Sequence, residues 1–186
     1  MIYQIGLTGA QGTGKSTLAR AVTDRLEAAG VAVEHCFGLG EGAIASGLAT
    51  GPSASAETVR LFANFHRARE ERQAREDGAV RVFDRTLFDA LAYAEVLGCL
   101  ASGELEALRE ATIASCRRFA QLIWLRVTVD YPVLTAVDES PVFRRAIDST
   151  IGRLARVHDI ALMKHAMPRE RLGDIAEEVA GRYLAR

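Results

Sequence analysis

The sequence predicts an α/β fold in which five parallel strands carry helices on both faces. Short apolar segments alternate with segments of helical periodicity along the chain, and no internal repeat interrupts them. One of these segments, within 119–127, is a nearly continuous apolar run, which is typical of a strand covered on both faces. The length of 186 residues suits one compact domain. We therefore expect a single three-layer α/β/α domain over 1–186.

In the first half of the chain, the pattern alternates strand and helix. We expect a strand over Ile2–Thr8, a helix over Ser16–Ala29 and a second strand over Val31–Phe37. Five glycines and a proline make Gly38–Ser55 too flexible for a regular element, and a loop of this length is often functional. A polar helix follows over Ser55–Asp77, with Val59, Phe62 and Phe65 as its inner stripe and its arginines mostly elsewhere.

The second half continues the alternation. A third strand ends at Asp84, and the spacing of Thr86 and Asp89 is that of a capping box at the start of a helix that runs to about Leu97. The remaining expected elements are a helix over Glu104–Arg118, a strand in Phe119–Val127, a helix over Val142–Val157, a short fifth strand in Asp159–His165 and a helix over Glu170–Leu184. For Asp159–His165, continuation of the preceding helix is the alternative.

The composition of the chain argues against several classes of binding partner. The net charge is −1, with 23 basic and 24 acidic side chains, so the chain lacks the positive field that binding to nucleic acid requires. Cys36, Cys99 and Cys116 are far apart in sequence and indicate neither disulfides nor a zinc site, which favours the cytoplasm. No apolar run is long enough to span a bilayer, so we expect no membrane partner. A homodimer is left open.

One motif carries the chemistry. Residues 9–16, GAQGTGKS, fit G-x-x-x-x-G-K-[ST] between an expected strand and an expected helix, which is the context of a phosphate-binding P-loop. Backbone N–H groups of such a loop and the helix N-terminus bind polyphosphate. Lys15 would reach the β- and γ-phosphates, and Ser16 would hold Mg²⁺. The candidate ATP-binding residues are Gly9, Gln11, Gly12, Thr13, Gly14, Lys15, Ser16 and Thr17.

Phosphoryl transfer also needs an acidic group near the γ-phosphate. Asp84 ends the third strand, where ligands bind in doubly wound sheets, so it is our candidate for ordering Mg²⁺ or accepting the proton of the attacking hydroxyl. Arg85 would bind an acceptor phosphate or offset the developing charge. The alternative is a local surface ion pair at the strand end.

The segment VFDRTLFDALAYAEVLG, together with the P-loop, resembles the small P-loop kinases of nucleosides and nucleotides. Its D-R-x6-A-Y spacing is similar to thymidylate kinases, whereas the later segments look more like the AAA-type domain of ribosylnicotinamide kinase-like proteins. The resemblance implies that Asp84 is the catalytic or magnesium-ordering acid, Arg85 a phosphate contact, Tyr93 a wall of the acceptor pocket, and about 126–156 a lid. Those domains commonly have Asp-Gly-x-Arg before the lid helix, and this chain does not.

Further candidates have ordinary structural alternatives. Arg145 is our candidate for the positive charge that closes over bound ATP. A solvent-exposed helix face accounts for Arg145 and for its neighbours Arg144 and Arg153 equally well. Glu41 would hold an acceptor hydroxyl, against the alternative of a solvent-facing loop acid. The four histidines show no metal-ligand spacing, and Trp124 is expected in the core.

Two functions follow from these residues. The first is a kinase that uses ATP and Mg²⁺ to phosphorylate a small acceptor of the nucleoside or nucleotide class. The second is a P-loop ATPase or nucleotide-dependent switch that acts through a protein partner. A GTPase is disfavoured because N-K-x-D is absent. The opening segment also resembles dephospho-CoA kinase, but the Asp-x-Asp expected after the second strand of that family is missing.

Overall fold

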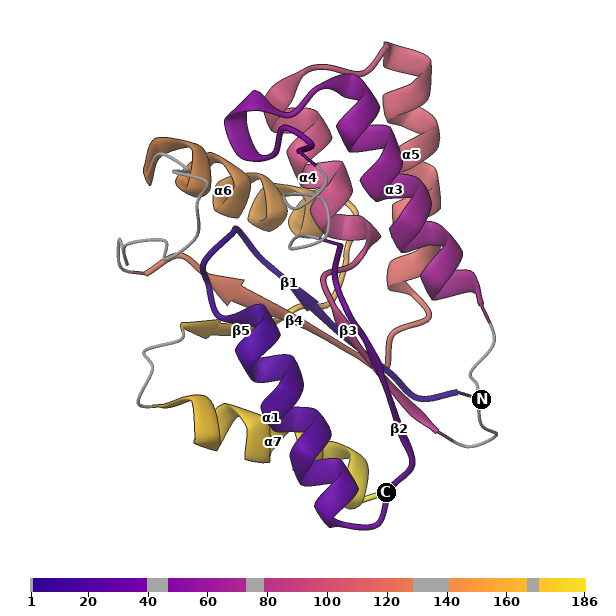
Figure 1. Cartoon of the computed structure of the whole chain (residues 1–186), viewed down its shortest axis with the longest axis vertical. Coiled ribbons are helices and arrows are strands. Elements are labelled where there is room, and N and C mark those ends of the chain that lie inside the picture. The colour runs from indigo at the N-terminus through magenta and orange to yellow at the C-terminus, as the bar shows by residue number, and fades with distance from the viewer. Residues whose placement is uncertain (1, 40–46, 73–78, 129–140, 167–170) are drawn as a thin grey trace.

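The computed structural model describes residues 2–39, 47–72, 79–128, 141–166 and 171–186. Its five strands form one parallel sheet in the order β2-β3-β1-β4-β5 (Figure 1). Their bounds are β1 Gln4–Thr8, β2 Val33–Cys36, β3 Val80–Asp84, β4 Gln121–Arg126 and β5 Met163–Ala166. Because the chain moves from β1 to one side of the sheet and later to the other, the strand order reverses at β1. Ligands of open α/β sheets bind beyond the carboxyl ends of the strands at such a point.

Helices form a layer on each face of the sheet. Figure 1 shows α1 (Lys15–Ala28) and α7 (Leu172–Leu184) on one face, and α3 (Ala56–Glu71), α4 (Leu87–Leu97), α5 (Ser102–Cys116) and α6 (Pro141–Val157) on the other. The first layer buries Leu18, Val22 and Val179 against the sheet, and the second buries Phe88, Leu91 and Ile147. The expected three-layer α/β/α fold is confirmed.

Most expected elements appear near their expected bounds. Two predictions need correction, and one open choice is decided. The segment Gly38–Ser55 was expected to hold no regular element, but Gly51–Ser53 forms a short 3₁₀ helix, because Pro52 favours a first helical turn. Helix α3 ends at Glu71 rather than near Asp77. Of the two alternatives for Asp159–His165, the strand is confirmed, as β5, and the continued helix is wrong because α6 ends at Val157.

Helix α6 is the described part of the predicted lid region. Its residues Ile147, Ile151 and Leu154 belong to the core beneath α4, so this helix is built into the layer. Trp124 is buried there, as expected, and its indole N–H donates to Asp148 Oδ1 at 3.0 Å. Residues 129–140 lie outside the described part of the chain. None of the described helices is both long enough and apolar enough to cross a membrane.

Candidate nucleotide and acceptor site

The loop between β1 and α1 has the backbone conformation of a phosphate cradle. Gly9 has φ +148° and packs so tightly that a Cβ there would lie 2.5 Å from the Leu125 carbonyl oxygen. Gly14, with φ +88°, is the N-cap of α1 and supplies no capping side chain. Since side chains disfavour these conformations, glycine is favoured at both positions, and the N-terminus of α1, which has no side-chain cap, is suited to attract an anion.

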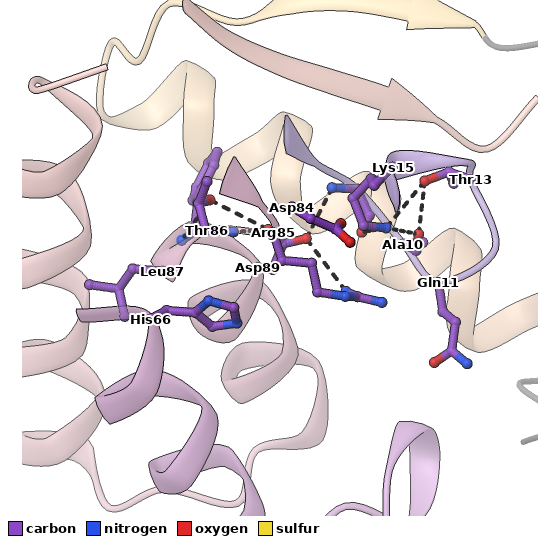
Figure 2. Close-up of polar contacts among 12 residues, drawn as sticks. Ala10, Gln11, Thr13, Lys15, His66, Asp84, Arg85, Thr86, Leu87 and Asp89 are labelled. Atoms are coloured by element: carbon purple, nitrogen blue, oxygen red, sulfur yellow. Dashed lines mark hydrogen bonds and ion pairs between the residues drawn. The ribbon is translucent and has the colours of Figure 1, made fainter. Parts of the chain in front are cut away.

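Lys15 lies inside this loop. Its ammonium group donates to the carbonyl oxygens of Gly9, at 2.8 Å, and Ala10, at 2.5 Å, and it lies 3.3 Å from Thr13 Oγ1 (Figure 2). The Thr13 hydroxyl donates to the Ala10 carbonyl at 2.9 Å. The loop is therefore organised around one buried cation. Ser16 and Thr17 follow on the first turn of α1, and both are exposed.

Asp84 ends β3 beside this loop. It pairs in register with Leu7 of β1, two residues before Gly9. Its side chain is buried, and its Oδ1 accepts no hydrogen bond from any residue that the structure describes. A buried carboxylate oxygen without a donor is costly, so such an atom is suited to a ligand. Gly38, after β2, lies so close that a Cβ there would be 3.1 Å from the Asp84 carbonyl oxygen.

Arg85 adopts a strained backbone conformation at the start of the next turn. Its φ is +68°, a value that residues other than glycine rarely adopt and that is concentrated at functional sites. The guanidinium group lies 3.7 Å from the Asp89 carboxylate and over the Tyr93 ring, at 5.9 Å from its centroid. Tyr93 in turn meets Phe143 of α6 edge to face, with centroids 5.7 Å apart. Within the described ranges, Arg85 forms an ion pair with Asp89, and the local Asp84–Arg85 pair considered from the sequence is not observed there. Figure 2 shows Lys15, Asp84 and Arg85 grouped at this edge of the sheet.

A buried arginine holds the backbone beneath this turn. Arg69 of α3 donates to the carbonyl oxygens of Cys36, at 2.8 Å, and Phe37, at the end of β2. It also donates to the carbonyl oxygens of Arg85 and Asp84, the latter at 3.4 Å. One guanidinium group thus joins the carboxyl ends of two neighbouring strands. The prediction that the arginines of this helix lie mostly on its outer face is wrong for Arg69.

His66, also on α3, contacts the Arg69 guanidinium. Its Nδ1 lies 3.0 Å from Arg69 Nη2, and the ring is buried. Burial, with added repulsion from Arg69 and Arg85, holds the pKa of His66 well below 6.5. The ring is therefore neutral near pH 7, and Nδ1 accepts from the guanidinium. Sequence reasoning missed both residues, although Val59, Phe62, His66 and Arg69 recur at helical spacing.

Two buried carboxylates accept hydrogen bonds from backbone N–H groups at the N-terminus of α4. Asp89 forms a capping box with Thr86, as expected, and accepts the Thr86 N–H at 2.9 Å. Glu70 of α3 accepts the Leu87 N–H at 2.6 Å and the Ser115 hydroxyl. Burial raises the pKa of Glu70. Together these groups cap the N-terminus of α4.

Helix α6 contributes an arginine to the nucleotide loop. Arg144 is buried, and its Nε donates to the Gln11 carbonyl oxygen at 3.0 Å. Arg145, the candidate from the sequence, is exposed. The structure places Arg144 at the loop instead. Arg153 pairs with Glu95 of α4. Glu41, the candidate for holding an acceptor hydroxyl, lies outside the described residues.

The residues present suit Mg²⁺ shared with a nucleotide. The unbonded Oδ1 of Asp84 and the exposed hydroxyl of Ser16 are oxygen donors of the type that Mg²⁺ prefers. No group of three His, Cys, Asp or Glu side chains suited to a metal ion occurs within the described ranges. Any Mg²⁺ at this site would therefore take its remaining ligands from phosphates and water.

Comparisons with known proteins agree with this architecture. No curated protein matches the chain. Among solved structures, the crystal structure of NadR protein in complex with NAD and AMP-PNP is similar over 97% of this chain, with a TM-score of 0.67 and 12% identity. The match covers 50% of the NadR chain, so the present chain spans half of that protein. The likeness shows the fold alone. The family model described as an AAA domain matches residues 4–170, and the chain belongs to this family.

Proposed function

We propose that the protein is a kinase that transfers the γ-phosphate of ATP, bound with Mg²⁺, to a small acceptor of the nucleoside or nucleotide class. The proposal rests mainly on the buried, unbonded Oδ1 of Asp84 at the strand end next to the P-loop. A carboxylate at this place can order Mg²⁺, and the strained Arg85 next to it adds a guanidinium group suited to an anionic acceptor. The sequence resemblance to P-loop kinases favours the same reaction class, and the similar NadR structure was solved with AMP-PNP, an analogue of ATP.

The residues divide the work by position. The N–H groups of the loop and of the first turn of α1 would bind the phosphates, and Lys15 would exchange its loop carbonyl partners for phosphate oxygens. Ser16 and Asp84 would hold Mg²⁺, which neutralises the charge that develops on the transferred group. Asp84 would also orient the acceptor hydroxyl and accept its proton. Arg85 would bind an anionic group of the acceptor, with Tyr93 beside it.

The test is ADP release from Mg-ATP in the presence of single nucleosides, nucleotides and nicotinamide-ribose compounds. We expect one compound to stimulate release strongly and to gain a phosphate, as seen by mass spectrometry. Asp84→Asn should abolish the stimulation and retain nucleotide binding. Asp148→Asn is the matched control, because this second buried aspartate lies on α6 and bonds Trp124 and Val127. If no compound in the panel gained phosphate, the kinase assignment would be abandoned.

The alternative is a P-loop ATPase or switch that acts through a protein partner. The contact between Arg144 of α6 and the Gln11 carbonyl favours it, because a helix that touches the nucleotide loop can report the nucleotide state. Slow ADP release that no acceptor stimulates, together with tight ADP binding, would support this function.

A further inference from the structure

The Asp89 carboxylate joins two parts of the site that are 80 residues apart in the chain. Asp89 is 2% exposed, and its Oδ1 accepts the N–H of Gly9 at 3.1 Å. The same oxygen lies 3.7 Å from the Arg85 guanidinium. Oδ2 accepts the N–H of Thr86 at 2.9 Å and lies 3.4 Å from its hydroxyl. One buried carboxylate therefore contacts the nucleotide loop, the acceptor-side arginine and the helix N-terminus (Figure 2).

The Gly9 contact lies at the entrance to the nucleotide loop. The peptide group between Thr8 and Gly9 leads from β1 into the loop, and its N–H is bonded to Asp89. The carbonyl oxygen of the same glycine accepts the Lys15 ammonium at 2.8 Å. On its other side, Gly9 packs against the Leu125 backbone. Asp89 thus supplies the hydrogen bond that orients the residue on which Lys15 is held.

We propose that Asp89 is a positioning residue for nucleotide binding. Its carboxylate fixes the orientation of the first peptide group of the loop and the position of the Arg85 guanidinium. The chemistry requires a carboxylate at this place. Two backbone N–H groups and a guanidinium are all donors, and an ionised carboxylate offers acceptors on both oxygens. An amide at position 89 would point its NH₂ group at one of these donors and leave a buried N–H unbonded.

A capping role alone makes a different prediction. Thr86 and Asp89 form the capping box of α4, and a residue that only caps this helix affects stability without affecting nucleotide affinity. Thr86→Ala removes the other half of the box and keeps the carboxylate. Glu70→Gln makes the same carboxylate-to-amide change at the same helix end, where Glu70 bonds Leu87 and Ser115. These two variants are the matched controls.

The experiment measures the Kd of Mg-AMP-PNP by titration calorimetry for each variant, together with its melting temperature. We expect Asp89→Asn to raise the Kd about tenfold, the value of one charge-assisted hydrogen bond. Thr86→Ala and Glu70→Gln should stay within about twofold of wild type, whatever their effect on melting. An unchanged Kd for Asp89→Asn overturns the proposal, as does an equal rise in either control.

Two further measurements test the role of Asp89. If Asp89→Asn does not fold, Asp89→Glu replaces it: glutamate suits the capping box, but its longer side chain moves the carboxylate away from Gly9, so a raised Kd is again expected and a wild-type Kd refutes the proposal. Arg85→Gln in the wild-type and Asp89→Asn backgrounds forms a double-mutant cycle read by urea unfolding, because the two side chains form an ion pair. Changes in the free energy of unfolding that do not add support the contact between Asp89 and Arg85, and additive changes overturn it.

The inference rests on the nucleotide-binding half of the proposed function. An acceptor panel without product would end the kinase assignment and leave the calorimetric result for Asp89 standing. A wild-type protein that does not bind Mg-AMP-PNP would overturn the role of Asp89.

Discussion

Acid should destabilise this protein through His66. The folded protein keeps the His66 ring neutral, because burial and the neighbouring Arg69 guanidinium hold its pKa well below 6.5. In the unfolded chain the same ring takes up a proton near pH 6.5. The unfolded state therefore binds more protons below that pH, and the free energy of unfolding falls as the pH decreases.

The size of the effect follows from this difference in proton binding. Between pH 7.5 and pH 5.5, a ring that is protonated only when unfolded lowers the free energy of unfolding by about 1.4 kcal/mol. For a chain of this length that corresponds to a fall of about 3–6 °C in Tm. Changes from carboxylates and other histidines add to the total, so the variant must be compared with wild type at both pH values.

The assay is urea unfolding of wild type and His66→Asn at pH 7.5 and 5.5. Asparagine Oδ1 can replace Nδ1 as the acceptor of the Arg69 N–H, and it does not titrate. We expect the fall in free energy between the two pH values to be about 1.4 kcal/mol smaller in the variant. His158→Asn, just beyond the end of α6, tests whether loss of any histidine has this effect. Equal falls in wild type and His66→Asn would refute the reasoning.

The remaining predictions concern the loop and helix packing. Lys15→Ala should lower turnover by about 10²–10³ while Tm changes by only a few degrees, as seen by ADP release and thermal melting; equal activity would contradict the role of the loop. Arg144→Ala should raise the KM for ATP about fivefold and Arg145→Ala less than twofold, because buried Arg144 bonds the Gln11 carbonyl oxygen whereas Arg145 is exposed. Gly152→Ala should cost about 1–3 kcal/mol in urea unfolding, because its Cβ would lie 2.7 Å from Trp124 Cη2. Gly181 is a helix glycine with open space around it, so Gly181→Ala should raise the free energy of unfolding by about 0.5–1 kcal/mol. Equal changes for Gly152→Ala and Gly181→Ala would show that the contact with Trp124 does not determine the loss of stability.

The sequence was sufficient for the features that depend on local pattern. The P-loop was predictable because its glycines, Lys15 and the flanking periodicity are contiguous. The place of Asp84 followed because parallel strands bring their carboxyl ends to one edge of the sheet. The confirmed five-stranded fold followed from the same alternation.

Contacts between distant segments could not be predicted in this way. Arg69 is buried because carbonyl oxygens at the ends of β2 and β3 surround its guanidinium, and no local pattern shows that these strand ends meet there. Hydrophobic periodicity also places arginines on the surface of a helix, so it does not predict the buried position of Arg69, nor that Arg144 rather than Arg145 contacts the loop. The choice between strand and helix for Asp159–His165 was open because a short apolar run fits both until its neighbours are known.

The way the nucleotide loop holds Lys15 gives the protein a built-in chemical reporter. The chain contains two lysines, Lys15 and Lys164. The first is 4% exposed with its ammonium on loop carbonyls, and the second is exposed on β5. An amine-reactive reagent should therefore label Lys164 quickly and Lys15 only as fast as the loop releases it. The ratio of the two labelled peptides would follow the opening of the loop against an internal standard, with no engineered probe.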